Sequence, residues 1–495
     1  MRASETRSAS EESPLLILTE DSSPECGRRP VWKAHARILD ERRCTIGQVS
    51  TSFLARVRDR LSPRQSLPPG LHAYERRDGA GGRVRVHLRV EPDGRGLLVI
   101  NAARVLHLNQ TAVEHARLVL EGVSEDAAVR EIGRRYRVDA HTARTDFCRM
   151  QAQLETLIRA DGAVCPIIGL NLERVDPFSV PLSAPYRMDL ALTYRCNNVC
   201  PHCYVARSAD HPEVDTDTWR AILARVWEVG VPHVCFTGGD ATLRGDLIEL
   251  VAHAEGLGLV TGLLTNGRRL SDAAYVQALA AAGLDHVQVT LESHDEAVHD
   301  GMVATPGAWR ETVLGVRNAV AADLYTTTNT TLTRENVEGI EETVAFIGSL
   351  GVPTFACNSL IYSGRGSTVG TGFREGELAP ILERVRDAAE RHGLRLIWYT
   401  PTQYCAFSPL QLELGVKACT AALYNMCVEP DGAVIPCQSY YEPLGHILDD
   451  PWEAIWNHDL ALTLRERRYV PEKCRECPEL AICGGGCPLY LQAAR

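Results

Sequence analysis

Short apolar runs alternate with longer amphipathic stretches through the middle of the chain. Each run ends on a polar or glycine-containing turn, and the stretch after it has the length and apolar spacing of a helix. The runs are residues 234–237, 260–267, 286–293 and 325–332, and the first is followed by a helical pattern at 243–254. Strands that alternate with helices build parallel βα units, so the pattern predicts an α/β domain over residues 185–398.

A different pattern precedes this domain. Residues 84–90 and 97–101 form two predicted strands around a turn at 92–94, and helical patterns follow at 111–121, 124–136 and 140–159. A small β-ribbon with three helices is a winged-helix-like arrangement, so we expect an α+β domain over residues 66–165. Residues 1–65 are polar apart from the apolar residues 15–18, and we expect much of this segment to be disordered or loosely attached.

Composition and charge narrow the class of protein. The chain has 495 residues, 45% of them hydrophobic, which allows two or three domains with cores of their own. The net charge of −11 gives no indication of a nucleic-acid or anionic-membrane surface. Seventeen cysteines, without a signal peptide or an apolar run near the length of a bilayer span, predict a cytoplasmic protein whose thiolates bind metal. Six cysteines stand alone and are expected to be buried or incidental thiols: Cys26, Cys44, Cys148, Cys165, Cys235 and Cys357.

The most informative cysteines are Cys196, Cys200 and Cys203, on a loop that follows an apolar strand. Three thiols can bind three irons of a 4Fe–4S cube and leave the fourth iron without a protein ligand. A zinc knuckle and three unrelated thiols are the alternative interpretations of the same triplet. Because polar sites in βα domains gather at the carboxyl ends of the strands, the loop and the glycine pair Gly238-Gly239 are expected on one side of the sheet.

This cysteine loop resembles that of the radical S-adenosylmethionine (radical SAM) superfamily. The resemblance implies a partial (β/α)6 TIM-like barrel and a cluster whose open iron binds S-adenosylmethionine, which is cleaved to a 5′-deoxyadenosyl radical. Residues 238–240 resemble the superfamily's Gly-Gly-Glu motif, although Asp240 is shorter than the usual Glu. The resemblance also implies further cofactor-binding candidates, which are Ser293, Asn329 and His202.

The last hundred residues carry a second group of cysteines. Cys419 is followed by Gly432 and Cys437, and later by four cysteines with spacings of two, five and three residues: Cys474, Cys477, Cys483 and Cys487. The arrangement resembles the SPASM auxiliary-cluster domain, here over residues 399–495. A pair of zinc sites is the alternative. The usual seventh cysteine is missing.

The SPASM resemblance implies two auxiliary 4Fe–4S clusters. We assign Cys474, Cys477 and Cys483 to one cluster, which is then short of a ligand. We assign Cys419, Cys437 and Cys487 to the other, with Cys405 as its fourth ligand. Cys427 falls within a predicted hairpin strand and is expected to be a core thiol.

The amino-terminal domain resembles the PqqD-like peptide-recognition domain around residues 105–112. That resemblance implies that the domain holds the leader of a ribosomally made precursor peptide as an added strand. The sequence therefore predicts a radical SAM peptide maturase that oxidises or cross-links core residues and receives electrons from a flavodoxin or ferredoxin. The alternatives are a SPASM-type protein maturase, a small-molecule dehydrogenase, and an iron–sulfur DNA-binding regulator. The sequence does not identify the attacked residue, the bond formed, an acid/base group or the oligomeric state.

Overall fold

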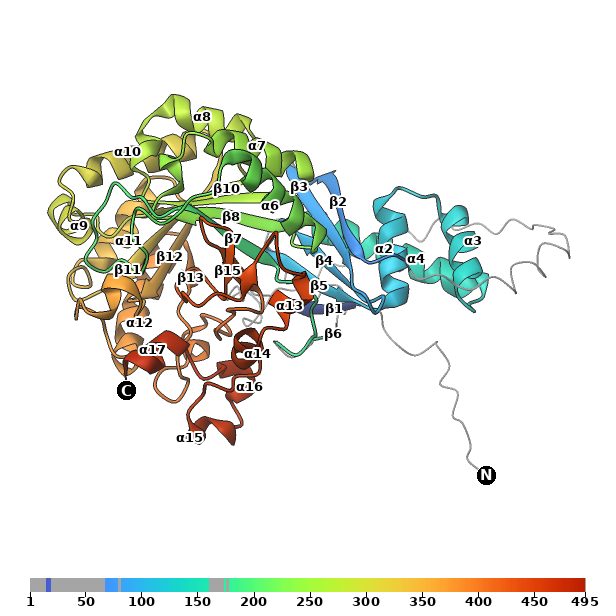
Figure 1. Ribbon diagram of the computed structural model, residues 1–495. Helices are drawn as coiled ribbons and strands as arrows, with labels where there is room; N and C mark the ends of the chain where they lie inside the picture. Colours follow the sequence, from blue (N-terminus) through green and yellow to red (C-terminus); the bar gives the residue numbers. More distant parts are fainter. Residues whose placement is uncertain (1–14, 19–66, 79–81, 160–172, 175–177, 495) are drawn as a thin grey trace, which may run out of the picture.

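The computed structural model describes residues 15–18, 67–78, 82–159, 173–174 and 178–494. The chain forms two β-sheets, one at its amino-terminal end and one shared by the middle and the carboxyl-terminal end (Figure 1). Among the described residues, no helix has the length and apolar character that a membrane crossing requires. Most of residues 1–65, where we expect disorder, lie outside the described residues.

The larger sheet contains seven consecutive parallel strands, which confirms the α/β partial barrel. The strands are β7 (Arg187–Thr193), β8 (His233–Gly238), β9 (Val260–Thr265), β10 (His286–Thr290), β11 (Tyr325–Leu332), β12 (Thr354–Ser359) and β13 (Arg395–Trp398). The helices of this domain are α6 (Thr216–Glu228), α7 (Leu247–Leu257), α8 (Ala273–Ala281), α9 (Glu296–Val303), α10 (Ala308–Ala321), α11 (Ile340–Ser349) and α12 (Leu378–Arg391).

Apolar and more polar side chains alternate along the strands, so the outer face of the barrel sheet is apolar and the inner face is more polar. On β8, Val234 and Phe236 pack with α6 residues such as Trp219 in the main hydrophobic core. The intervening side chains therefore face the barrel interior, because neighbouring residues of a strand point to opposite faces. Aspartates cap several helices, for example Asp215, whose side chain accepts a hydrogen bond from the backbone N–H of Thr218 at the start of α6.

The carboxyl-terminal segment extends the same sheet. Strand β14 (Asn425–Val428) pairs in parallel with β7, and β15 (Ala433–Ile435) and β16 (Gly445–His446) follow in antiparallel order. Short helices complete the segment: α13 (Trp452–Trp456), α14 (Asp459–Arg465), α15 (Glu472–Arg475), α16 (Leu480–Cys483) and α17 (Pro488–Ala493). Cys427 is fully buried within β14, as predicted for a core thiol.

The amino-terminal sheet has more strands than the sequence analysis predicted. The predicted hairpin is β3 (Arg83–Val90) and β4 (Gly96–Ile100), but β2 (Gly70–Arg77) and β5 (Arg104–Leu108) flank it to give a four-stranded antiparallel meander. Strand β1 (Leu15–Leu18) adds to β5, and β6 (Glu173–Arg174) adds to β1. The three predicted helices are present as α2 (Gln110–Leu120), α3 (Glu125–Arg135) and α4 (Ala140–Arg159).

Strand β3 is buried on both faces, which explains its alternation of apolar and basic residues. Its valines and Leu88 pack against α2 and α4. Its basic residues point the other way and bind the barrel: Arg85 Nε donates to Asp285 Oδ1 at 2.9 Å, and Arg89 Nη1 donates to the carbonyls of Pro185 and Gly230 at 3.1 and 3.2 Å. These barrel residues all precede strands, so the amino-terminal domain docks at the amino-terminal end of the barrel (Figure 1).

Candidate functional site

The cysteine loop begins where β7 ends, at the opposite end of the barrel from the docked domain. Thr193 closes β7, and its hydroxyl accepts the backbone N–H of Arg195 at 3.0 Å. The backbone N–H of Cys203 donates to the carbonyl of Cys200 at 3.2 Å and tightens the loop. Burial raises the pKa of the Cys200 thiol, and the neighbouring thiols of Cys203 and Cys196 raise it further. The three predicted ligands thus lie together, and a cation at their centre would relieve the repulsion between their thiolates.

Gly238 and Gly239 let the next loop pack directly on the cysteine loop. Gly238 has φ 137°, and a Cβ there would lie 2.0 Å from the carbonyl oxygen of Thr193. A Cβ on Gly239 would lie 2.4 Å from the carbonyl oxygen of Arg195. The backbone N–H of Gly239 donates to the carbonyl of Thr193 at 2.7 Å. Glycine is required at both positions because any side chain would separate the two loops.

The side chain of Asp240 is fully buried, and both of its oxygens accept hydrogen bonds from within the protein. Its Oδ1 accepts hydrogen bonds from the backbone N–H and the hydroxyl of Thr242, at 3.0 and 2.6 Å. Its Oδ2 accepts from the Thr265 hydroxyl and the Asn266 backbone N–H, at 2.8 and 2.9 Å. A short helix at Ala241–Leu243 therefore comes first, and α7 starts at Leu247, later than the predicted 243.

Asn266 is a site residue that the sequence analysis missed. Its side-chain amide donates to the Sγ of Cys196 at 3.8 Å and to Asn197 Oδ1 at 2.6 Å. Asp240 holds the Asn266 backbone, so a chain of contacts runs from the acid through Asn266 to the cysteine loop. The only sequence signal is its place before Gly267, after the third strand of the barrel sheet, which we interpreted as a simple turn.

The other predicted cofactor contacts have different surroundings. His202 Nε2 lies 3.0 Å from Oε1 of Glu292, a fully buried carboxylate that also accepts the backbone N–H of Thr331 at 2.8 Å. The Ser293 hydroxyl accepts the backbone N–H of Asp295 at 3.1 Å, as a turn residue does. Asn329 donates to Asn358 Oδ1 at 2.8 Å, and its own buried Oδ1 has no hydrogen-bond partner among the described residues.

The carboxyl-terminal cysteines form two groups. Four of them line one cavity of about 360 Å³: Cys405, Cys474, Cys477 and Cys483. The second group is Cys419, Cys437 and Cys487. Burial raises the pKa of the Cys419 thiol, and the nearby thiols of Cys487 and Cys437 raise it further.

The structure corrects the assignment of Cys405. The sequence analysis placed it with Cys419, Cys437 and Cys487, but it lies with the other group, where its thiol and that of Cys483 add to the burial that raises the pKa of Cys474. The reason is a turn that docks on Cys483: the Cys483 thiol lies 3.6 Å from the carbonyl of Thr402, and the backbone N–H of Tyr404 donates to its sulfur at 3.3 Å. The group that seemed short of a ligand therefore contains four thiols.

Comparisons with known proteins identify domains and relatives of the chain. The model of the radical SAM superfamily matches residues 190–347, and that of the SPASM iron–sulfur cluster-binding domain matches residues 419–478. A PqqA peptide cyclase from Xanthomonas campestris pv. campestris is 31% identical over 315 residues, which cover 61% of this chain and 82% of that protein. The chain belongs to the radical SAM superfamily.

Solved structures share the fold of this radical SAM enzyme. The structure of Streptococcus suis SuiB bound to S-adenosylmethionine has a TM-score of 0.62 and 18% identity, covering 82% of this chain and 95% of that one. SuiB bound to the precursor peptide SuiA has a TM-score of 0.61 at 18% identity, and covers 85% of this chain and 97% of that one. The shared architecture includes the region before the barrel.

The residues at both cysteine sites suit the cofactors of a radical SAM enzyme with a SPASM domain. Thiolates are the ligands of iron–sulfur clusters, and three of them lie on one loop at the carboxyl ends of the barrel strands.

Glu375 lies beside the carboxyl-terminal cavity, where burial raises its pKa to about 7 although the Gln403 backbone N–H donates to it at 3.0 Å. No sequence signal distinguished this acid from the other acids of the chain.

Proposed function

We propose that this radical SAM enzyme is a peptide maturase that oxidises or cross-links residues of a ribosomally made precursor peptide. The observation that carries the proposal is the four-stranded domain docked on the barrel, in a chain similar to proteins named PqqA peptide cyclase and to SuiB, which was solved with its precursor peptide. A protein maturase or a small-molecule dehydrogenase has no need of a domain that captures a leader.

The radical cluster is proposed to lie on Cys196, Cys200 and Cys203, with S-adenosylmethionine on the open iron. When bound, this pair of cofactors supplies a 5′-deoxyadenosyl radical that abstracts a hydrogen atom from the substrate. Gly238 and Gly239, which pack on the backbone of the cysteine loop, are proposed to offer their own backbone to the cofactor. The Oδ1 of Asn329, which has no partner among the described residues, is proposed as an acceptor for it. The fully hydrogen-bonded Asp240 supports these loops and, with Asn266, orients Cys196. Ser293 and His202 remain weaker candidates because each already has a partner within the protein.

Two auxiliary 4Fe–4S clusters are proposed for the carboxyl-terminal cysteines. Cys405, Cys474, Cys477 and Cys483 supply a full ligand set, whereas Cys419, Cys437 and Cys487 leave one position for another ligand. Net oxidation of a substrate by two electrons requires an acceptor for the second electron, and these clusters suit that role. The electron that initiates cleavage of S-adenosylmethionine is a separate one, and it is proposed to come from a flavodoxin or ferredoxin of a reducing cytoplasm.

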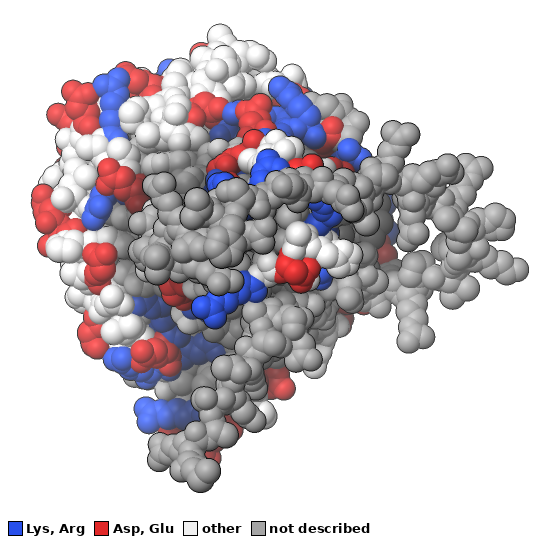
Figure 2. All heavy atoms as spheres, turned by 90° about the vertical axis from the view of Figure 1, so that its right-hand side faces the viewer, with Lys and Arg blue, Asp and Glu red and all other residues white. Residues whose placement is uncertain are grey.

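The amino-terminal domain is proposed to bind the leader of the precursor by strand addition. Strand β5 already pairs with β1, which comes from a distant part of the sequence, so a leader that adds to β5 would take the place of β1. The helices of the domain are poorly suited to DNA, because Arg117 pairs with Glu121 at 2.6 Å and Arg144 pairs with Asp126 at 2.8 Å. Figure 2, which views the molecule from this side, shows acidic and basic side chains interspersed over the described surface.

The position of this domain sets a requirement on the precursor. The domain docks at the amino-terminal end of the barrel, whereas the cysteine loop lies at the carboxyl ends of the strands. Strand β7 has seven residues, so the two ends are about 23 Å apart at ~3.3 Å per residue. A peptide held by the domain therefore needs at least about seven extended residues between its leader and the residue that reacts.

The test uses the reconstituted full-length enzyme under anaerobic conditions, with S-adenosylmethionine, a reductant and the short peptide encoded beside its gene. We expect the peptide to lose the mass of two hydrogens, and the loss to disappear when the leader is removed. Shortening the spacer below the required length should abolish modification while leader binding, measured by fluorescence anisotropy, is unchanged. An unmodified peptide, or binding of neighbouring promoter DNA in a gel shift, would reject the proposal.

A further inference from the structure

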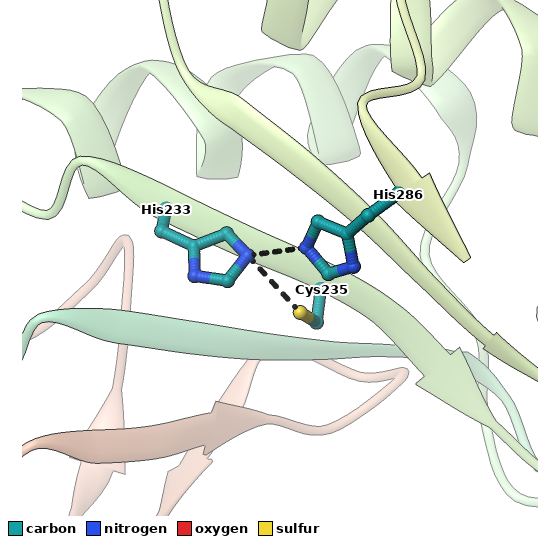
Figure 3. Close-up of side chains that lie close together, drawn as sticks. All are labelled: His233, Cys235 and His286. Carbon is teal, nitrogen blue, oxygen red and sulfur yellow. Dashed lines mark hydrogen bonds between the residues drawn. The ribbon is translucent and has the colours of Figure 1, made fainter. Parts of the chain in front are cut away.

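Three metal-binding side chains meet inside the barrel, at the end away from the cysteine loop. His233 and Cys235 come from β8 and His286 comes from β10, and Figure 3 shows the three side chains pointing toward one another. Their ligating atoms all lie within 4.8 Å of one another. His233 and Cys235 are buried, and His286 is half-buried. The sequence analysis took Cys235 for an isolated thiol, because His286 is more than fifty positions away.

The register of the sheet explains how this cluster forms. His233 and Cys235 are two residues apart on one strand and so share a face. Cys235 pairs with Gly262 of β9, and Gly262 pairs with His286 of β10, so these three residues form one row across the sheet. A Cβ on Gly262 would lie 2.2 Å from Cε1 of His286 and 2.8 Å from the sulfur of Cys235. The absence of a side chain at Gly262 lets the His286 imidazole lean across toward β8.

Hydrogen bonds among these three side chains cannot satisfy all of their polar atoms. Nε2 of His233 lies 2.9 Å from Nε2 of His286 and 3.4 Å from the sulfur of Cys235. A neutral imidazole nitrogen carries either one hydrogen or one lone pair in the plane of its ring, so Nε2 of His233 can satisfy only one of these two neighbours. A cation between the three groups would instead accept one lone pair from each of them.

We propose that His233, Cys235 and His286 bind a Zn²⁺ ion. Zinc bonds of about 2.0–2.1 Å to nitrogen and 2.3 Å to sulfur place tetrahedral ligands roughly 3.3 Å apart for two nitrogens and roughly 3.6 Å apart for nitrogen and sulfur. The observed 2.9 and 3.4 Å are within a few tenths of an ångström of these separations. Two imidazoles and one thiolate are borderline-soft ligands that suit zinc. Binding releases the thiol proton to solvent, and the fourth position is left to a water molecule.

The surrounding charges and position favour a structural role. The guanidinium of Arg187, whose charge reaches all three side chains, is paired with the carboxylate of Asp189 at 3.0 Å, so its charge is offset. The site lies beside the docked amino-terminal domain, whose His87 Nε2 is 2.7 Å from the carbonyl oxygen of Gly258, just before β9. An ion here would tie β8 to β10 across β9, under the surface that receives the domain. Residues at this end of a barrel usually serve stability and not chemistry.

The first experiment measures zinc K-edge X-ray absorption of the wild-type holoenzyme, with its iron–sulfur clusters in place. We expect about one equivalent of zinc with two nitrogen ligands from histidine and one sulfur ligand. A zinc shell made of sulfur alone would show that zinc occupies the carboxyl-terminal cysteines and would overturn the proposal. Failure of the holoenzyme to retain zinc during dialysis against micromolar zinc and then buffer would overturn it as well.

The second experiment compares two single-cysteine variants. Cys235→Ala removes the sulfur ligand, and Cys357→Ala removes an equally buried thiol from β12 of the same sheet. We expect Cys235→Ala to lose the equivalent of zinc, at least a tenfold drop in retained metal, while Cys357→Ala keeps it and both keep their iron. Equal zinc in the two variants would overturn the proposal. If Cys235→Ala does not fold, His286→Gln replaces it, with the same expected loss.

Discussion

The two cysteine regions of this enzyme are built in different ways. Cys196, Cys200 and Cys203 lie within eight residues of one loop, so their spacing in the sequence already determines their spacing in space. The carboxyl-terminal cysteines come from separate segments, and the turn that brings Cys405 to Cys483 is held by a contact between residues 81 positions apart. A ligand set on one loop can be assigned from its motif. A set assembled by tertiary contacts is assigned only when the contacts are known.

The largest expected effect tests the local set. Replacing Cys196, Cys200 and Cys203 together by Ala should abolish reductive cleavage of S-adenosylmethionine, because no other three thiols lie on one loop at this end of the barrel among the described residues. Iron bound by the carboxyl-terminal cysteines should remain. The readouts are 5′-deoxyadenosine by liquid chromatography and iron per chain. Continued formation of 5′-deoxyadenosine would show that the loop does not hold the radical cluster.

The next effect tests the set assembled by tertiary contacts. Cys405→Ala should leave one auxiliary cluster with three thiolates in place of four, so that a chelator removes about four of about twelve iron atoms per chain faster than it does in the wild type. The loss should appear in the Mössbauer spectrum of the auxiliary iron, with the radical cluster unchanged. Cys148→Ala, on helix α4 of the amino-terminal domain, is the control and should lose iron no faster than the wild type. If Cys405→Ala also lost iron no faster than the wild type, Cys405 would not be a ligand.

These two regions also mark how far the sequence could be interpreted. Strands β8 to β11 and the helices after them were predicted because apolar residues such as Val234 and Phe236 recur with the period of a buried strand. Strand β2 was missed because four of its eight residues are polar or charged, and only its pairing with β3 makes it a strand. The position of Cys405 depends on the turn at Thr402, and no local pattern encodes that contact.

A smaller effect is expected when a residue that contacts the cysteine loop is replaced. Asn266→Ala removes the amide that donates to the sulfur of Cys196 and to Asn197. Loss of a group that orients a metal ligand typically weakens metal binding by about 10–100-fold, and we expect iron of the radical cluster to be lost faster to a chelator by a similar factor. Asn318→Ala is the matched control, since its amide binds the carbonyls of Leu270 and Ser271 instead. Equal rates of iron loss in the two variants would place Asn266 outside the cluster's support.

The smallest effect concerns Cys427, which lies between Cys419 and Cys437 in the sequence but which we expect not to be a cluster ligand. Cys427 is fully buried in β14, where it pairs with Ile435 of β15, and burial raises its pKa well above the usual value for a thiol. Its packing partners in the core include Ala191, Tyr194 and Ile435, so we interpret Cys427 as a core residue. Cys427→Ala should therefore leave the iron content unchanged and lower the free energy of unfolding by about 1–2 kcal/mol, the cost of a small cavity. Iron content and denaturant unfolding of the same preparation give the two readouts. Loss of iron from this variant would mean that Cys427 of β14 is a ligand. The role of a cysteine could then not be predicted from the sequence even where the sequence places it in a strand.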